Sequence, residues 1–96
     1  MRFEWDPMKN KANILKHRVS FDVVETIFDD KNTKYIFDKA HSGGEEKFHI
    51  IGTSSDFRKM NVCHCHRGTE NETIRIISAR KATKTEIDYY YGRIEP

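Results

Sequence analysis

Basic side chains gather in the second half of the sequence, where they could hold a phosphate group. Between residues 57 and 84 there are seven lysines and arginines against two acids, Glu70 and Glu72. The seven are Arg58, Lys59, Arg67, Arg75, Arg80, Lys81 and Lys84. Fixed cations beside free helix amides form an anion site, and can stabilise a phosphorane in which negative charge builds. The cluster could attract a polyanion such as nucleic acid, or an acidic protein partner, although the charge totals alone favour an ordinary solvated surface.

Three consecutive tyrosines follow this basic cluster. Tyr89, Tyr90 and Tyr91 could stack on the bases of single-stranded RNA. Tyr90 and Tyr91 fall on the apolar stripe of a predicted helix, which favours core packing for these two. Tyr89 remains the candidate for RNA binding.

Histidines and acids supply candidates for proton transfer. Imidazoles titrate near neutral pH, so His17, His64 and His66 are candidate acids or bases. Glu45 and Glu46 precede a predicted strand, where a carboxylate can act as a base or hold an arginine. Each residue also has a structural interpretation, and the residue types alone do not separate the two.

The sequence Cys63-His64-Cys65-His66 invites a zinc interpretation. On a strand, alternate side chains face opposite ways, so each face offers two ligands where a structural zinc site needs four. Cysteines packed beneath a sheet are the simpler interpretation, and we expect no metal and no other cofactor. The one-residue spacing favours free thiols in a reducing compartment over a disulfide.

Hydrophobic spacing predicts helices at the N-terminus. A short strand at residues 2–5 precedes a helix from Pro7 to about His17, which Asp6 caps. The apolar residues of this helix share one face: Met8, Ala12 and Leu15. A second short helix begins after Ser20.

Four strands and a final helix complete a predicted α+β domain. The strands span residues 33–38, 47–53, 58–66 and 73–80, and their short connections favour an antiparallel meander. Thr83 and Glu86 form a capping box that starts the last helix. Its apolar stripe, expected to lie on the sheet, comprises Ile87, Tyr90, Tyr91 and Ile94. We expect Arg67 and Arg80 to meet at one concave site, with the loop of Glu45 and Glu46 nearby.

The composition suits a soluble domain, with 36% hydrophobic and 33% charged residues. No apolar run approaches the roughly 20 residues that a membrane-spanning helix needs. The N-terminus is too polar for a signal peptide. A cytoplasmic location is expected.

Three stretches resemble the BrnT family, the toxin half of BrnT–BrnA type II toxin–antitoxin systems. They are FEWDPMKNKANILKHRVSFDVVETIFDD, EEKFHIIG and IRIISARKATKTEIDYY, and the likeness runs in order through nearly the whole chain. The resemblance implies one domain over residues 1–96 with a RelE-like fold: a compact antiparallel sheet, two short N-terminal helices and one C-terminal helix. It also implies metal-independent RNA cleavage that arrests growth. The implied partner is BrnA, a ribbon-helix-helix antitoxin, and operator DNA would be contacted only through it.

The resemblance carries over Lys16, His17, Glu46, Arg67 and Arg80, and the basic cluster and the tyrosines supply the other candidates. Arg80 and Arg67 are expected to stabilise the phosphorane, and Glu46 and His17 are the further catalytic candidates. The expected RNA-binding residues are Lys16, Arg75, Lys81, Lys84 and Tyr89. The alternative is a non-catalytic module that binds the antitoxin and acts as a co-repressor.

Two positions depart from the family pattern. Arg18 stands where the family usually has glycine, which ends a helix in the left-handed conformation at no steric cost. Lys47 stands where arginine is usual, and lysine lacks the bidentate fork.

Overall fold

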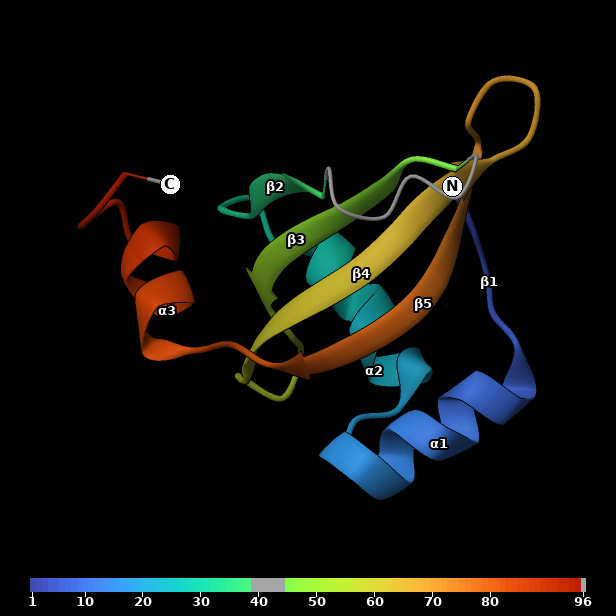
Figure 1. The fold of residues 1–96 in the computed structure, drawn as a ribbon, viewed down its shortest axis with the longest axis horizontal. Coiled ribbons are helices and arrows are strands. Elements are labelled where there is room, and N and C mark those ends of the chain that lie inside the picture. Colours follow the sequence, from blue (N-terminus) through green and yellow to red (C-terminus); the bar gives the residue numbers. More distant parts are fainter. Residues whose placement is uncertain (39–44, 96) are drawn as a thin grey trace.

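A five-stranded mixed sheet organises the chain, and the computed structural model describes it over residues 1–38 and 45–95 (Figure 1). The strands are β1 (Arg2–Glu4), β2 (Lys34–Asp38), β3 (Lys47–Thr53), β4 (Lys59–Arg67) and β5 (Thr73–Lys81). Their spatial order is β1-β5-β4-β3-β2, and β2 to β5 form the predicted antiparallel meander. The α+β class is thus confirmed. β1 adds a parallel edge on β5, which three residues of sequence pattern are too few to predict.

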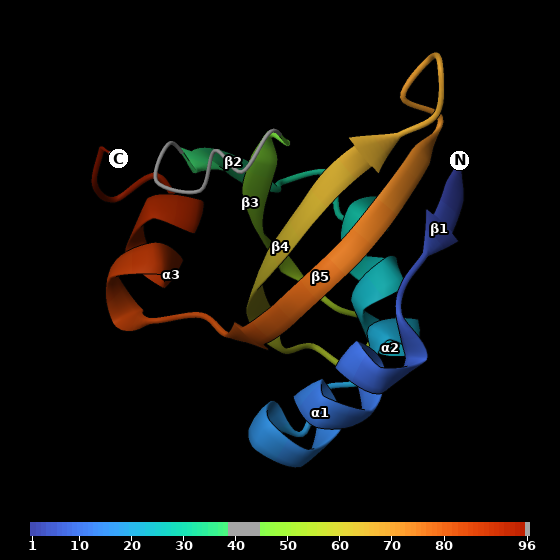
Figure 2. The same ribbon diagram turned by 45° about the vertical axis from the view of Figure 1, so that its right-hand side comes forward.

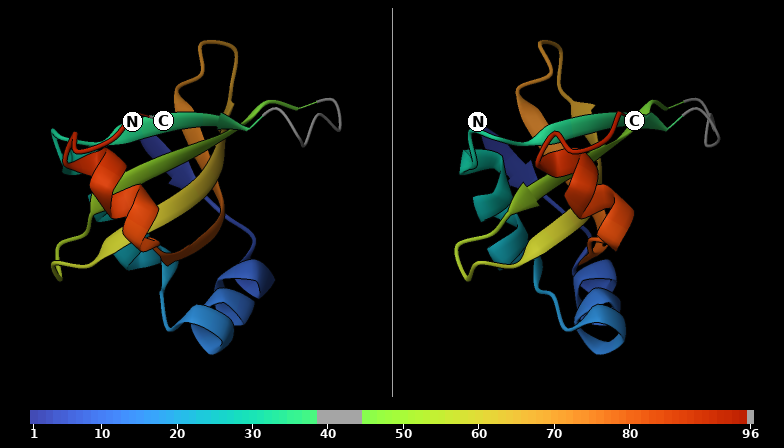
Figure 3. Two further views of the ribbon diagram at one scale, coloured as in Figure 1. Left: turned by 60° about the vertical axis from the view of Figure 1, so that its left-hand side comes forward. Right: turned by 90° about the vertical axis from the view of Figure 1, so that its left-hand side faces the viewer.

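Helices lie on both sides of the sheet and along one edge of it. They are α1 (Pro7–His17), α2 (Phe21–Val24), the 3-10 helix η1 (Glu25–Asp29) and α3 (Lys84–Tyr90). Figure 3 shows the sheet between α3 on one face and α2 with η1 on the other. α1 follows the edge of β5 beyond the short β1 (Figure 2).

The main core fills the space between the sheet and the α2–η1 segment. Its buried members are Val19, Phe21, Val24, Ile27, Ile50, Met60, Val62, Ile74, Ile76 and Ala79. A smaller cluster of Ile51, Ala82 and Tyr90 lies under α3 on the other face. Because α3 is only seven residues long, it covers part of that face and leaves room for polar side chains.

The predicted apolar stripe of the last helix is only half correct. Ile87 and Tyr90 pack against the sheet, but α3 ends at Tyr90 and the chain turns at Gly92 with a φ of 75°. Tyr91 and Ile94 consequently lie beyond the helix and are largely exposed. Their core placement, expected from the spacing, is wrong.

α1 has its apolar face turned to solvent. Met8 and Leu15 are 70% and 78% exposed, while the buried residue of the helix is Asn13. The Asn13 amide accepts from the N–H of Ala79 and donates to the carbonyl of Val19, at 3.1 and 3.0 Å. These bonds satisfy the Ala79 N–H at the β5 edge and the Val19 carbonyl in the loop after α1, so a polar face packs inward. The stripe predicted from the sequence exists, but it does not face the core.

Arg18 adopts the left-handed conformation that glycine would favour, with φ 59° and ψ 35°. We expect Arg18→Gly to raise the free energy of unfolding by about 1 kcal/mol, because the steric cost of a Cβ in this region disappears. Urea denaturation measures the change. Arg18→Ala is the matched control: it also removes the side chain, keeps the Cβ, and should not gain this stability. A glycine variant no more stable than the alanine variant would contradict the assignment.

Candidate active site and nucleic-acid interface

Arg67 and Arg80 lie at opposite ends of the β4–β5 pair. Arg67 is in register with Thr73, and Arg80 with Asn61. The six-residue step from Asn61 to Arg67 along β4 corresponds to about 20 Å. The expectation that the two arginines share one concave site is wrong. β4 and β5 run in opposite directions, so their C-terminal ends, which carry Arg67 and Arg80, lie at opposite ends of the strand pair.

The Arg67 end also holds the acidic pair that was expected near Arg80. Arg67 Nε lies 2.8 Å from Glu45 Oε1, and the Cys65 thiol donates to the same carboxylate at 3.5 Å. Glu46, the next residue, is exposed and lies two residues before Phe48, the first residue of β3 that pairs with β4. Solvent screens this exposed ion pair, so it contributes little to stability.

Two further predicted RNA-binding cations have acidic partners. Arg75 Nη1 lies 2.7 Å from Glu4 of β1, at the edge of the sheet. Lys84, at the start of α3, is 3.8 Å from Asp88 and its side chain is almost fully exposed. Neither side chain lines the pocket described below.

Arg80 is held by Glu86 through two hydrogen bonds. Arg80 Nη1 and Nη2 donate to the two carboxylate oxygens at 2.8 and 2.9 Å. Burial raises the pKa of Glu86, but hydrogen bonds from Arg80, the Thr83 N–H and Asn61 outweigh it and lower that pKa to about 2. Glu86 also completes the predicted capping box with Thr83, which is confirmed. The carboxylate therefore ties the end of β5 to the start of α3.

One edge of the Arg80 guanidinium remains available. Nη1 and Nη2 face Glu86, and Nη1 also donates to the Lys81 carbonyl at 3.2 Å. The Nε–H and the second Nη2–H donate to no residue in the described part of the chain, and the side chain is 42% exposed. Guanidinium offers five donors in a planar fork, so this second edge has the geometry to bind two phosphate oxygens.

The hydrogen-bonded chain continues from Glu86 through Asn61 to His49. Asn61 Nδ2 donates to Glu86 Oε2 at 2.6 Å, so its Oδ1 faces His49 Nδ1 at 2.7 Å as an acceptor. Asn61 thereby orients the ring, because its Oδ1 can only accept a proton that Nδ1 carries. We call His49, Asn61, Glu86 and Arg80 the polar network. A histidine oriented by a second group is typical of proton-transfer sites.

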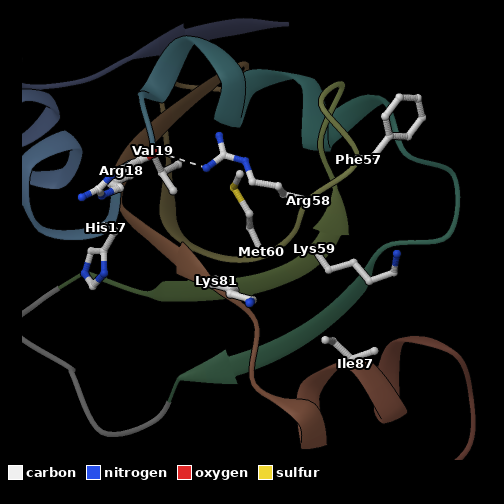
Figure 4. Close-up of a pocket in the computed structure, with 9 residues that line it drawn as sticks. All are labelled: His17, Arg18, Val19, Phe57, Arg58, Lys59, Met60, Lys81 and Ile87. Carbon is white, nitrogen blue, oxygen red and sulfur yellow. Dashed lines mark hydrogen bonds between the residues drawn. The ribbon is translucent and has the colours of Figure 1, made fainter.

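A pocket of about 470 Å³ lies at the same end of the sheet (Figure 4). It is lined by His17, Arg18, Val19, Phe57, Arg58, Lys59, Met60, Lys81 and Ile87. Figure 4 shows Met60 in the middle of the group, with the cationic side chains arranged around it. We call this site the basic pocket. Of the predicted residues, it brings together His17 and Lys81, from α1 and β5.

Charge and an exposed aromatic ring distinguish the basic pocket. Arg58 has partners, at 2.7 Å to Asp56 and 3.0 Å to the Arg18 carbonyl. Arg18 and Lys81 form no ion pair with other described residues. Phe57 is 87% exposed with a φ of 65°, an uncommon conformation for a bulky residue. The pocket thus combines cations with a ring on which a base can stack.

Tyr89 and Lys16, both predicted to bind RNA, lie outside the basic pocket. The Tyr89 hydroxyl donates to the Tyr35 carbonyl at 3.4 Å, and Lys34 lies over its ring, so Tyr89 packs toward β2. Lys16 borders a separate groove beside α1 together with Asn13. His17 is the neighbour that turns into the pocket.

His64 is a core residue and cannot reach a substrate. Its side chain is fully buried, with ring centroids of Phe28, Tyr35 and Phe48 within about 6 Å, as expected for packed aromatic pairs. Burial, followed by the charge of His66, lowers the pKa of His64 to about 4. His66 is paired with Ile74, at the end of β4 remote from Arg80.

Cys63 and Cys65 are buried and form no disulfide. Cys65 shares the face of its partner Arg75, opposite to that of His64 and His66, as predicted from strand alternation. Across the described residues, no three side chains of His, Cys, Asp or Glu converge on one point.

Comparisons with known proteins point to one family. The family model described as "Ribonuclease toxin, BrnT, of type II toxin-antitoxin system" matches residues 5–86. The chain is also similar to the crystal structure of the Brucella abortus ribonuclease toxin, BrnT, at 26% identity and a TM-score of 0.67. That match covers 88% of this chain and 99% of the other. No curated protein matches, and the described helices are too short or too polar to cross a membrane.

Proposed function

The chain belongs to the BrnT family of ribonuclease toxins of type II toxin–antitoxin systems, and on that basis we propose that it is a metal-independent endoribonuclease neutralised by a BrnA-type antitoxin. We place its catalytic centre at the polar network and its RNA-binding surface at the basic pocket. The observation that carries this placement is the unbroken hydrogen-bonded chain from His49 to Arg80.

The proposed reaction is attack of a ribose 2′-hydroxyl on the adjacent phosphorus. His49 takes the 2′-hydroxyl proton, and the new bond between the 2′-oxygen and phosphorus forms while the bond from phosphorus to the 5′-oxygen breaks. The open edge of Arg80 donates to the phosphorane oxygens as their charge increases. The 5′-oxygen leaves with a proton from water, so the products are a 2′,3′-cyclic phosphate and a 5′-hydroxyl.

The basic pocket would hold the RNA strand next to this centre. Lys81 follows Arg80 directly in β5, and Ile87 follows Glu86 in α3, so the two sites share the same end of the sheet. Cations with no protein anion beside them attract phosphates, and Phe57 is placed to stack on a base. His17 contributes to RNA binding in this arrangement, in place of the catalytic role expected from the sequence.

Arg67, Glu46 and Arg75 have no catalytic role in this proposal. They lie at the opposite end of the sheet, and Arg67 and Arg75 are bound to carboxylates there. Of Arg67 and Arg80, which the sequence assigned to stabilising the phosphorane, only Arg80 has that role in this proposal.

We expect His49→Gln to lower the rate of RNA cleavage by about 10² to 10⁴-fold, because a general base is lost. The measurement is single-turnover cleavage of labelled RNA by the purified chain in excess EDTA, with analysis of the product ends. His66→Gln is the matched control and should cleave normally, because His66 lies at the end of β4 remote from Arg80.

Three results would contradict the proposal. They are loss of wild-type cleavage in EDTA, products with 3′-hydroxyl ends, and a His49→Gln variant as active as the wild type. A wild-type chain that neither cleaves RNA nor arrests growth when expressed alone would favour the co-repressor alternative.

A further inference from the structure

The outward face of α1 is apolar, which is unusual for a helix at the surface. Met8, Ala12 and Leu15 lie at positions i, i+4 and i+7, and all three are exposed. Ile14 extends the stripe on one side with 42% exposure. In Figure 2, α1 lies at the rim of the molecule, beside β5 and α2.

This orientation of α1 is held by specific hydrogen bonds on its inner face. Asn10 Oδ1 accepts from the N–H of Phe21 at 2.9 Å, and Asn13 bonds to Ala79 and Val19. Rotating the helix to bury the apolar stripe would leave these backbone groups without partners, at about 1 to 3 kcal/mol for each. The stripe therefore stays available for another molecule.

A groove of about 280 Å³ runs beside the stripe, between α1 and β5. Its walls include Ala12 and Lys16 of α1 and Ile77, the extra residue of the β5 bulge between Ile76 and Ser78. The groove gives an apolar side chain of a partner a place to insert.

Charge indicates what kind of partner fits. α1 carries Lys9, Lys11 and Lys16 around the stripe, has no acid in its first turn, and is capped at its C-terminal end by Arg18. A partner with carboxylates beside its apolar residues would be complementary. A second copy of this chain would instead bring two sets of lysines together, which is repulsive.

We propose that the outer face of α1, with the adjoining groove, binds the antitoxin through an amphipathic helical segment whose apolar residues are flanked by Asp or Glu. The proposal rests on the assignment to a type II toxin–antitoxin family, which supplies the partner. His17 lines both the groove and the basic pocket, so a segment bound here reaches the RNA-binding surface. Neutralisation would then follow from blocked access of RNA.

The test is a titration of the purified chain with the antitoxin encoded beside it. Met8→Glu combined with Leu15→Glu should weaken binding at least 100-fold, because two carboxylates replace the apolar contacts and face the acidic partner. The matched control is Tyr91→Glu combined with Ile94→Glu, which makes the same change of charge on exposed apolar residues elsewhere. The control should bind like the wild type.

A second variant tests charge alone. Lys9→Glu combined with Lys16→Glu should also weaken binding, and the loss should shrink as salt is raised. Circular dichroism should show wild-type folding for every variant, since all the changed side chains are exposed.

The titration measures only the affinity for the antitoxin. Its result can therefore be interpreted even if the chain proves not to cleave RNA. Wild-type affinity in the Met8–Leu15 variant, or no binding of the antitoxin to the wild type, would overturn the proposal. A wild-type dimer that dissociates when Met8 and Leu15 are replaced would assign the face to a second copy instead.

Discussion

Removing the Arg80 side chain is expected to lower RNA cleavage by about 10³-fold. The reason is the loss of the guanidinium edge proposed to bind the phosphorane. The measurement is single-turnover cleavage, compared under conditions where every variant is fully folded.

The variant is best made in a chain that also carries Glu86→Gln. Arg80→Ala alone would leave the Glu86 carboxylate, whose side chain is 15% exposed, without its cation and would destabilise the fold. The cost is below that of a fully buried pair, because the Arg80 side chain is 42% exposed and solvent screens it. Glutamine removes the charge and still completes a capping box. Glu86→Gln alone is the reference for the double variant, because any loss that it shows belongs to the orientation of Asn61 and Arg80. Arg67→Ala, at the far end of the sheet, should cleave normally. A double variant as active as Glu86→Gln alone would refute the role of Arg80.

His64→Phe is expected to remove most of the acid sensitivity of folding between pH 6.5 and 4.5. The pKa of His64 is about 4 in the folded chain and near 6.5 when unfolded. Between these two pH values the unfolded state therefore binds a proton that the folded state does not bind. This contribution to stability is complete above pH 6.5 and is lost as the pH falls, by about 3 kcal/mol at pH 4.

Phenylalanine suits this site because aromatic rings already surround it. Phe28, Tyr35 and Phe48 contact His64, and neither ring nitrogen of His64 has a hydrogen-bond partner in the described part of the chain. Urea denaturation at a series of pH values measures the slope. His17→Gln is the control and should keep the wild-type slope, while an unchanged slope in His64→Phe would show that another group is responsible. Below pH 4.5, protonation of Glu86 adds its own loss of stability.

The local elements were predictable because their signals are local. Asp6 with Pro7 starts α1, and Thr83 with Glu86 starts α3, as the sequence indicates. Each signal involves groups within a few residues of one another, so no knowledge of distant contacts is required. The order of the elements and the family resemblance followed from the same stretches.

The direction that α1 faces was not predictable from its spacing. Periodicity shows that Met8, Ala12 and Leu15 share a side, but not which side packs. α1 covers the edge of β5, where Asn13 satisfies the Ala79 N–H and also the Val19 carbonyl of the following loop, which leucine cannot do. The usual rule that the apolar face packs inward failed for this reason.

The sequence by itself determined the secondary structure, the family and the kinds of side chain available for RNA chemistry. The tertiary structure decided which of them meet: Arg67 and Arg80 separate, and Arg80 joins Glu86, Asn61 and His49. Strand register and the path of α3 bring residues 49, 61, 80 and 86 together. Neither the register nor the path of the helix can be predicted from any one segment of the sequence. Side-chain chemistry depends on separations of about 3 Å, which long-range pairing alone sets.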